Sequence, residues 1–169
     1  MVYSDWSSDV CSSDLDSDLE TMRRCIEQLR AFGIAHEVRV ISAHRTPEAA
    51  HEYARTAAER GLKLIIAAAG MSAALPGVMA AGTSLPVIGV PMASGPLGGV
   101  DAAVSIMQMP PGVPVACMAI ASAGAANAGI FAAQILALGD EALAGKLRQF
   151  RADQAAKVAA RDAAVQKQL

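Results

Sequence analysis

The chain has 169 residues, a formal net charge of −2 and an apolar fraction of 53%, with only 4% aromatic residues. This length suits one domain that buries a continuous core without disulfides. The basic residues are scattered, so the sequence contains no electrostatic footprint for nucleic acid or an anionic membrane. Cys11, Cys25 and Cys117 are far apart and form no CxxC pair, which favours a reducing cytoplasm and gives no metal-ligand spacing.

Residues 64–82 are almost wholly apolar and nearly long enough to span a bilayer. Gly70, Pro76 and Gly77 interrupt this stretch, and much of it is alanine, which contributes little to membrane insertion. The N-terminus has no basic start followed by an apolar region, as a secretory signal would have. We therefore expect neither a membrane helix nor a signal peptide.

The first residues differ in composition from the rest of the chain. Residues 4–15 repeat Ser-Asp and Ser-Ser-Asp with almost no apolar periodicity, which is poor material for a core strand. We expect residues 1–15 to lie outside the natural fold and residues 16–169 to form a single α/β domain.

Strands and helices alternate from Asp18 onward. Leu19, Met22, Ile26 and Leu29 recur at helical spacing until a stop at residue 33. Later helices are predicted over 47–60, 72–81, 99–107, 124–138 and 141–168, and strands over 36–42, 62–69, 85–91 and 113–121. This alternation predicts a doubly wound parallel sheet with helices on both sides, a long C-terminal helix, and a first strand that is missing or replaced.

Ligands in such sheets bind at the carboxyl ends of the strands. The loops 42–47, 70–77 and 94–99 each follow directly on a predicted strand, so we expect them to line one edge. The loop 70–77 consists mainly of small residues, which let a ligand approach backbone amides; a plain packing turn is the alternative. It matches neither a dinucleotide fingerprint nor a phosphate loop.

His44 is the candidate for chemistry in the first of these loops. An imidazole there can move a proton near neutral pH. Arg45, the hydroxyls of Ser42 and Thr46 and the amides of the following helix can hold a phosphate. The alternative is an ordinary loop histidine, with Thr46 acting as a helix cap.

Several separated motifs together resemble the N5-carboxyaminoimidazole ribonucleotide mutase family. The matching segments are 16–18 (the end of Gly-Ser-x-Ser-Asp), 42–47 (SAHRTP), 75–77 (LPG), 85–91 (LPVxGVP), 105–112 (SIxQMPxG), 124–127 (GAAN) and 132–138 (AAQILAL). They occur in the family's order between residues 16 and 138. The resemblance implies a three-layer, flavodoxin-like α/β/α subunit assembled into a homo-octamer, without metal or organic cofactor.

The resemblance also implies an activity in purine biosynthesis. In the family, a carboxylate moves from the exocyclic nitrogen of an aminoimidazole ribonucleotide to ring carbon C4, through decarboxylation and recapture of carbon dioxide. His44 matches the family's proton-transfer histidine. The implied substrate-binding positions are Ser17, Asp18, Ser42, Ala43, Arg45, Ala69, Gly70, Met71, Ser72 and Leu75.

Two departures from the family pattern leave alternatives open. Asp14 and Leu15 replace the usual Gly-Ser, so a phosphate-binding hydroxyl is lost, which favours a catalytically impaired nucleotide-binding relative. The common GGAAHLPG reads GMSAALPG here, with Ala74 in place of a second active-site histidine. The related class that carboxylates aminoimidazole ribonucleotide directly with carbon dioxide also lacks that histidine, so direct carboxylation is a further alternative.

Overall fold

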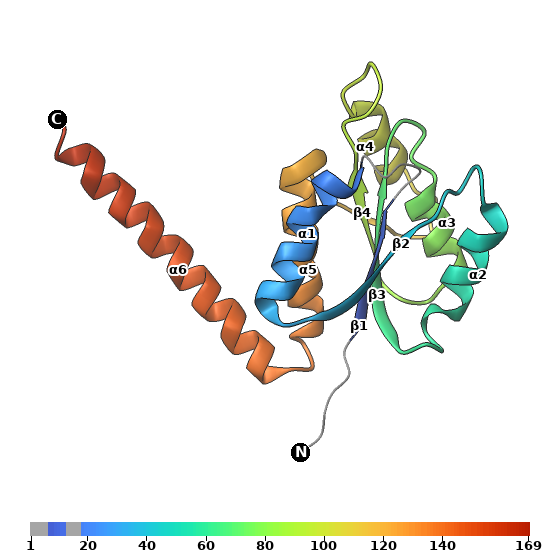
Figure 1. Cartoon of the computed structure of the whole chain (residues 1–169), viewed down its shortest axis with the longest axis horizontal. Coiled ribbons are helices and arrows are strands. Elements are labelled where there is room, and N and C mark those ends of the chain that lie inside the picture. The colour runs from blue at the N-terminus through green and yellow to red at the C-terminus, as the bar shows by residue number, and fades with distance from the viewer. Residues whose placement is uncertain (1–6, 13–17) are drawn as a thin grey trace.

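The computed structural model describes the backbone of residues 7–12 and the whole of residues 18–169 (Figure 1). The strands are β1 (Ser7–Ser12), β2 (Ala35–Val40), β3 (Leu62–Ala69), β4 (Val87–Pro91) and β5 (Ala116–Cys117). The helices are α1 (Asp18–Phe32), α2 (Pro47–Ala57), α3 (Leu75–Gly82), α4 (Val100–Met107), α5 (Ala121–Leu136) and α6 (Glu141–Gln166).

The strands form one five-stranded sheet in the order β2-β1-β3-β4-β5, and every neighbouring pair is parallel. This is the flavodoxin-like arrangement, in which the order reverses between β1 and β3. The predicted doubly wound parallel sheet is therefore confirmed, and its strands all end at the same edge.

The structure contains a strand before α1, at the place in the chain where the sequence predicted a missing or replaced first strand. β1 lies between β2 and β3, with Val10 opposite Val38 on one side and Ile66 on the other. A strand with parallel neighbours on both sides satisfies its backbone N–H and C=O groups through them, whatever its side chains are. The segment therefore pairs within the sheet in spite of its Ser-Asp-rich composition; whether residues 1–15 are foreign to the natural fold stays a prediction.

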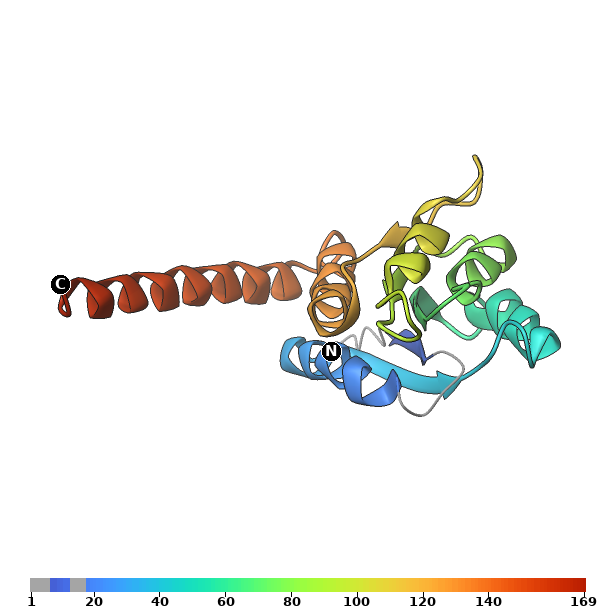
Figure 2. The same ribbon diagram turned by 90° about the horizontal axis from the view of Figure 1, so that it is seen from above.

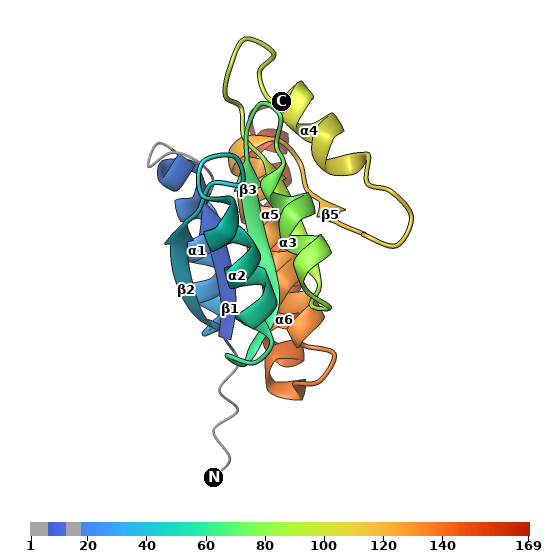
Figure 3. The same cartoon turned by 90° about the vertical axis from the view of Figure 1, so that its right-hand side faces the viewer.

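The core consists of two apolar layers, one on each face of the sheet. On one face, α1 and α5 cover Leu64, Ile66 and Ala68, whereas α2, α3 and α4 cover Ile65 and Ala67 on the other (Figures 1 and 3). Side chains alternate between the faces of a strand, so a strand apolar at every buried position needs cover on both sides. β3 is such a strand, as its sequence predicted.

Helix α5 uses its small residues within the subunit. A Cβ atom added at Gly129 would lie 2.8 Å from the carbonyl oxygen of Cys25 in α1. Ala125, Ala128 and Ala132 are fully buried on the same side. These small residues let the backbone of α1 approach α5 closely.

Some predicted boundaries were wrong. α3 begins at Leu75 rather than residue 72, because Pro76 fits the first turn of a helix, and residues 72–74 therefore stay in a loop. α5 begins at Ala121, three residues earlier than predicted, and β5 spans only Ala116–Cys117. The first difference matters for function, because the loop before α3 borders the candidate site.

Helix α6 packs on the domain only through its first turns. Asp140 caps it by accepting a hydrogen bond from the Leu143 amide at 3.0 Å, and Lys146 Nζ donates to the carbonyl oxygen of Phe32 at 2.8 Å. Phe150 meets Phe32 edge to face, with 5.4 Å between ring centroids. From residue 151 onward every side chain is exposed, and the helix projects away from the domain (Figure 2).

The apolar stretch 64–82 is divided between the core strand β3, the following loop and α3. Among the residues that the structure describes, no helix is both long enough and apolar enough to cross a membrane.

Candidate active site at the carboxyl edge of the sheet

Three loops meet at the carboxyl ends of the strands, at the upper edge of the sheet in Figure 3. They are residues 41–46 after β2, 70–74 after β3 and 92–99 after β4. The sequence predicted this arrangement from the position of each loop behind a strand. All three are described by the structure, so their mutual contacts define the site.

A closed turn carries His44. The Ser42 amide donates to Thr46 Oγ1 at 3.0 Å, and the Thr46 hydroxyl donates back to the Ser42 carbonyl oxygen at 3.0 Å. The Arg45 amide donates to Ser42 Oγ at 3.1 Å. Ser42 is buried, whereas His44 and Arg45 are exposed. The turn therefore fixes the backbone from the inside and presents the imidazole and the guanidinium outward.

These bonds correct the roles expected of Thr46. Its hydroxyl hydrogen is already donated to Ser42, so the side chain is not available to donate to a phosphate in this conformation. It makes no capping hydrogen bond to α2 either. Ser42 Oγ accepts from Arg45, but a hydroxyl that accepts one bond keeps its own hydrogen to donate.

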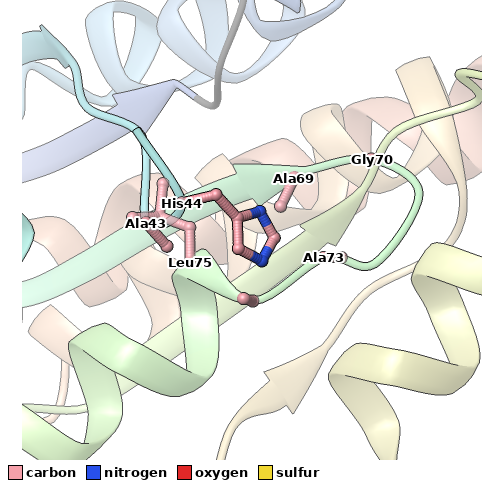
Figure 4. Close-up of a pocket in the computed structure, with 7 residues that line it drawn as sticks. Ala43, His44, Ala69, Gly70, Ala73 and Leu75 are labelled. Atoms are coloured by element: carbon pink, nitrogen blue, oxygen red, sulfur yellow. The ribbon is translucent and has the colours of Figure 1, made fainter. Parts of the chain in front are cut away.

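His44 borders a small recess (Figure 4). The recess has a volume of about 20 Å³ and is lined by Ala43, His44, Ala69, Gly70, Ala73, Ala74 and Leu75. In Figure 4 the imidazole lies between Leu75 and the loop that runs from Gly70 to Ala73. A volume a little above 10–15 Å³ holds one molecule the size of water. The recess therefore accommodates one small molecule, and a larger ligand has to lie across its mouth.

The structure brings together five of the predicted site residues as walls of this recess, namely Ala43, His44, Ala69, Gly70 and Leu75. Met71 and Ser72 belong to the same loop but are exposed and do not line it. Ala73 is a wall residue that sequence reasoning missed, since a lone alanine carries no chemical signal; its place in the loop between β3 and α3 was the available clue.

One predicted position lies on α1. Asp18 is its first residue and is buried, which places a carboxylate at the positive end of the helix dipole. Ser17, Asp14 and Leu15 lie outside the described residues, so their predicted contributions stay predictions.

Neither described cysteine side chain has the properties of a reactive thiol. Burial raises the pKa of Cys25 to about 12, and partial burial also raises the pKa of Cys117. The thiolate is the nucleophilic form, so both groups stay protonated at neutral pH. Among the side chains that the structure describes, no three His, Cys, Asp or Glu residues are grouped to hold a metal ion.

With this geometry in place, comparison with known proteins identifies the family. The family model described as AIR carboxylase matches residues 10–157, which is most of the chain. The chain belongs to the AIR carboxylase family. The matched range includes each wall residue of the recess and the whole of the turn that carries His44.

Family members that carry curated names are closely similar. An N5-carboxyaminoimidazole ribonucleotide mutase of Vibrio vulnificus (strain CMCP6) is 54% identical over 144 residues, covering 85% of this chain and 89% of that protein. The protein of the same name from Bacillus subtilis (strain 168) is 56% identical over 135 residues, covering 80% of this chain and 83% of that protein. The crystal structure of Treponema denticola PurE superposes with a TM-score of 0.81 at 26% identity, covering 93% of this chain and 97% of the other.

Proposed function

We propose that this chain is a purine-biosynthesis isomerase that converts N5-carboxyaminoimidazole ribonucleotide to 4-carboxy-5-aminoimidazole ribonucleotide. The observation that carries the proposal is the His44 imidazole beside a recess of about 20 Å³. An isomerisation of this kind needs one group that exchanges a proton with the substrate and one enclosed space that retains carbon dioxide. Relatives at 54% and 56% identity bear the name of this mutase.

The proposed reaction uses His44 twice. The bond between the exocyclic nitrogen and the carboxylate breaks, carbon dioxide leaves, and the electron pair stays on nitrogen, which takes a proton from the His44 imidazolium. Ring carbon C4 then attacks the retained carbon dioxide, and its proton returns to His44. The proton and the carboxylate are both conserved, so the net change is a migration without cofactor or metal.

Ala43, Ala69, Ala73, Ala74 and Leu75 border the recess beside the imidazole. Carbon dioxide is a small apolar molecule, so these alkyl groups favour its retention beside His44 over its escape into water. The imidazole at the mouth is then within reach of both reacting atoms of a ribonucleotide that lies across it.

The phosphate and ribose of the substrate are proposed to lie along the neighbouring loops. Arg45 supplies a guanidinium, and Ser42 supplies a hydroxyl donor. The first turn of α2 supplies backbone amides, which the Thr46 side chain does not cap. Asp18 is the proposed ribose-binding carboxylate, with Ser17 beside it in the chain. Met71 and Ser72 are proposed to contribute their backbone rather than their side chains, since both residues are exposed and neither lines the recess.

Direct carboxylation of aminoimidazole ribonucleotide is the second candidate. Ala74 lines the recess where the family pattern has a histidine, so His44 is the one imidazole beside it among the described residues. Assays with each of the two ribonucleotides, with and without bicarbonate, separate the candidates. The mutase proposal predicts bicarbonate-independent turnover of the carboxylated ribonucleotide. Turnover that requires aminoimidazole ribonucleotide and bicarbonate would replace it with direct carboxylation.

The protein is further proposed to act as a homo-octamer in the cytoplasm. Residues 64–139 contain a single charged residue, Asp101, although about a quarter to a third of a typical soluble surface is charged. Within this region Val100, Val104 and Met107 follow one another at helical spacing along α4 and are 47–60% exposed. Loss of charge together with exposed apolar side chains is typical of subunit interfaces. Free thiols at Cys25 and Cys117 are in keeping with a reducing compartment.

A further inference from the structure

The two loops that follow β3 and β4 interlock beside the recess. The Ser94 side chain packs against Gly70: a methyl group added at Gly70 would overlap Ser94 Oγ and lie 3.1 Å from Ser94 Cβ. Met71 presses on Gly95 in return, because a methyl group added there would lie 3.3 Å from Met71 Cγ. Each loop thus contributes one glycine and one side chain that fills the space above the other glycine. We call Gly70, Met71, Ser94 and Gly95 the clasp.

The backbone of the clasp is held in a conformation that side chains disfavour. Met71 has φ 53°, in the left-handed region that non-glycine residues rarely adopt, and Gly95 has φ 75°. A strained conformation persists only where surrounding contacts determine it. The packing of Met71 against Gly95 is such a contact, although 56% of the methionine side chain remains exposed.

A backbone hydrogen bond joins the clasp to the sheet. The Met92 amide donates to the carbonyl oxygen of Ala69 at 2.8 Å, directly before the two interlocking loops begin. Ala69 and Gly70 are both walls of the recess beside His44. Ser94 contacts this wall at Gly70, although it does not itself line the recess.

We propose that Ser94 is a positioning residue, which holds the Gly70 wall at the distance from His44 that the reaction requires. This inference rests on the proposed function. The recess is scarcely larger than the smallest space that holds one molecule. A shift of its wall by a few tenths of an ångström therefore changes how closely carbon dioxide is confined near the imidazole.

One substitution removes the contact that the clasp makes with the recess wall. Ser94→Ala deletes the hydroxyl that contacts Gly70. Leu97→Ala is the matched control, because Leu97 lies on the same loop and is 62% exposed.

The kinetic readout is the division of the effect between kcat and KM. We expect kcat to fall about tenfold or more in Ser94→Ala, as small misplacements of reacting groups produce, with KM nearly unchanged because phosphate and ribose contacts remain. Leu97→Ala should stay within about twofold of the parent. A lowered melting temperature with unchanged kcat would reduce the clasp to a structural role and overturn the proposal.

Hydrogen exchange separates failure of this inference from failure of the proposed function. Amides of residues 70–74 should exchange faster in Ser94→Ala than in the parent and in Leu97→Ala, whichever reaction the protein catalyses. If the parent turns over neither ribonucleotide but this exchange pattern is found, the proposed function fails and the clasp stands as a positioning element of the loop. Unchanged exchange in Ser94→Ala would contradict the clasp itself.

Discussion

Ser42 and Thr46 close the loop that carries His44 with a reciprocal pair of hydrogen bonds, each 3.0 Å long, between the backbone of Ser42 and the hydroxyl of Thr46. A third bond, from the Thr46 amide to the Ser42 carbonyl oxygen at 2.9 Å, completes the turn. The imidazole is exposed and is carried by this turn, so its direction depends on the turn.

Thr46→Val should therefore impair turnover without any loss of a substrate contact. Valine keeps the shape of threonine but neither donates nor accepts, so both hydroxyl bonds are lost and the Ser42 amide is left without its acceptor, at a cost of about 1–3 kcal/mol. We expect kcat to fall by about tenfold, since His44 loses its fixed direction. Thr46→Ser keeps the hydroxyl and should retain most activity. Equal kcat values for Thr46→Val and Thr46→Ser would show that the turn does not orient the imidazole.

Cys25 should make the folded protein sensitive to alkali. Its pKa is raised by burial from 9.0 to about 12, so the folded state keeps a proton that the unfolded state releases. The contribution of this thiol to the free energy of unfolding is fully present below pH 9 and is lost as the pH rises toward 12. The loss amounts to on the order of 4 kcal/mol across that range.

The measurement is urea unfolding of the parent and of Cys25→Ala at pH 8 and pH 10.5. Cys25→Ala is less stable at pH 8, because it leaves a cavity at a fully buried position. The difference between the two proteins should narrow at pH 10.5, because only the parent loses the thiol contribution. A constant difference at both pH values would contradict the raised pKa.

Assembly should depend on the uncharged face of α4. Val104→Lys places a charge on the exposed stripe formed by Val100, Val104 and Met107, where burial against another subunit would cost several kcal/mol. We expect light scattering to show octamers for the parent and smaller species for the variant. Ala58→Lys, at an exposed position next to charged residues, is the matched control and should remain assembled. A parent protein that is monomeric at micromolar concentration would contradict the assembly proposal.

Leu15→Ser tests the hypothesis that this chain binds its ligand poorly. Leu15 stands where the family pattern has a serine hydroxyl and lies outside the described residues. A restored donor to phosphate should tighten ribonucleotide binding by about 1–3 kcal/mol, or roughly tenfold to a hundredfold in Kd. Calorimetric titration with aminoimidazole ribonucleotide measures the change. An unaltered Kd would mean that Ser42, Arg45 and the helix amides suffice.

The sequence predicted the parts of the fold that rest on strong periodicity. The apolar run 62–69 coincides with β3, and the helical spacing of Met22, Ile26 and Leu29 marks the buried face of α1. Leu19 shares that spacing but is 36% exposed, because it lies in the first turn, beyond the edge of the core. β1 was underestimated because its position depends on pairing with two distant strands rather than on its own side chains.

The candidate site was predictable where a residue type carries chemistry. His44 and its flanking residues were identified from the position of their loop behind a strand and from the motif. Ala73 and Ser94 were not identified, because their contributions arise from contacts with residues distant in the chain rather than from chemical reactivity. Thr46 was misassigned because a hydroxyl in a turn has several partners within reach, and only the folded geometry decides among them.

The most direct test of the account is the turnover of N5-carboxyaminoimidazole ribonucleotide by His44→Asn. Asparagine keeps a polar side chain but cannot cycle a proton, so kcat should fall by about 10²–10⁴-fold or below detection. The melting temperature and the affinity for aminoimidazole ribonucleotide should stay close to those of the parent, because the exposed His44 side chain contributes little to the core. Turnover within a few-fold of the parent, with folding and binding intact, would contradict the assignment of His44 as the proton-transfer residue.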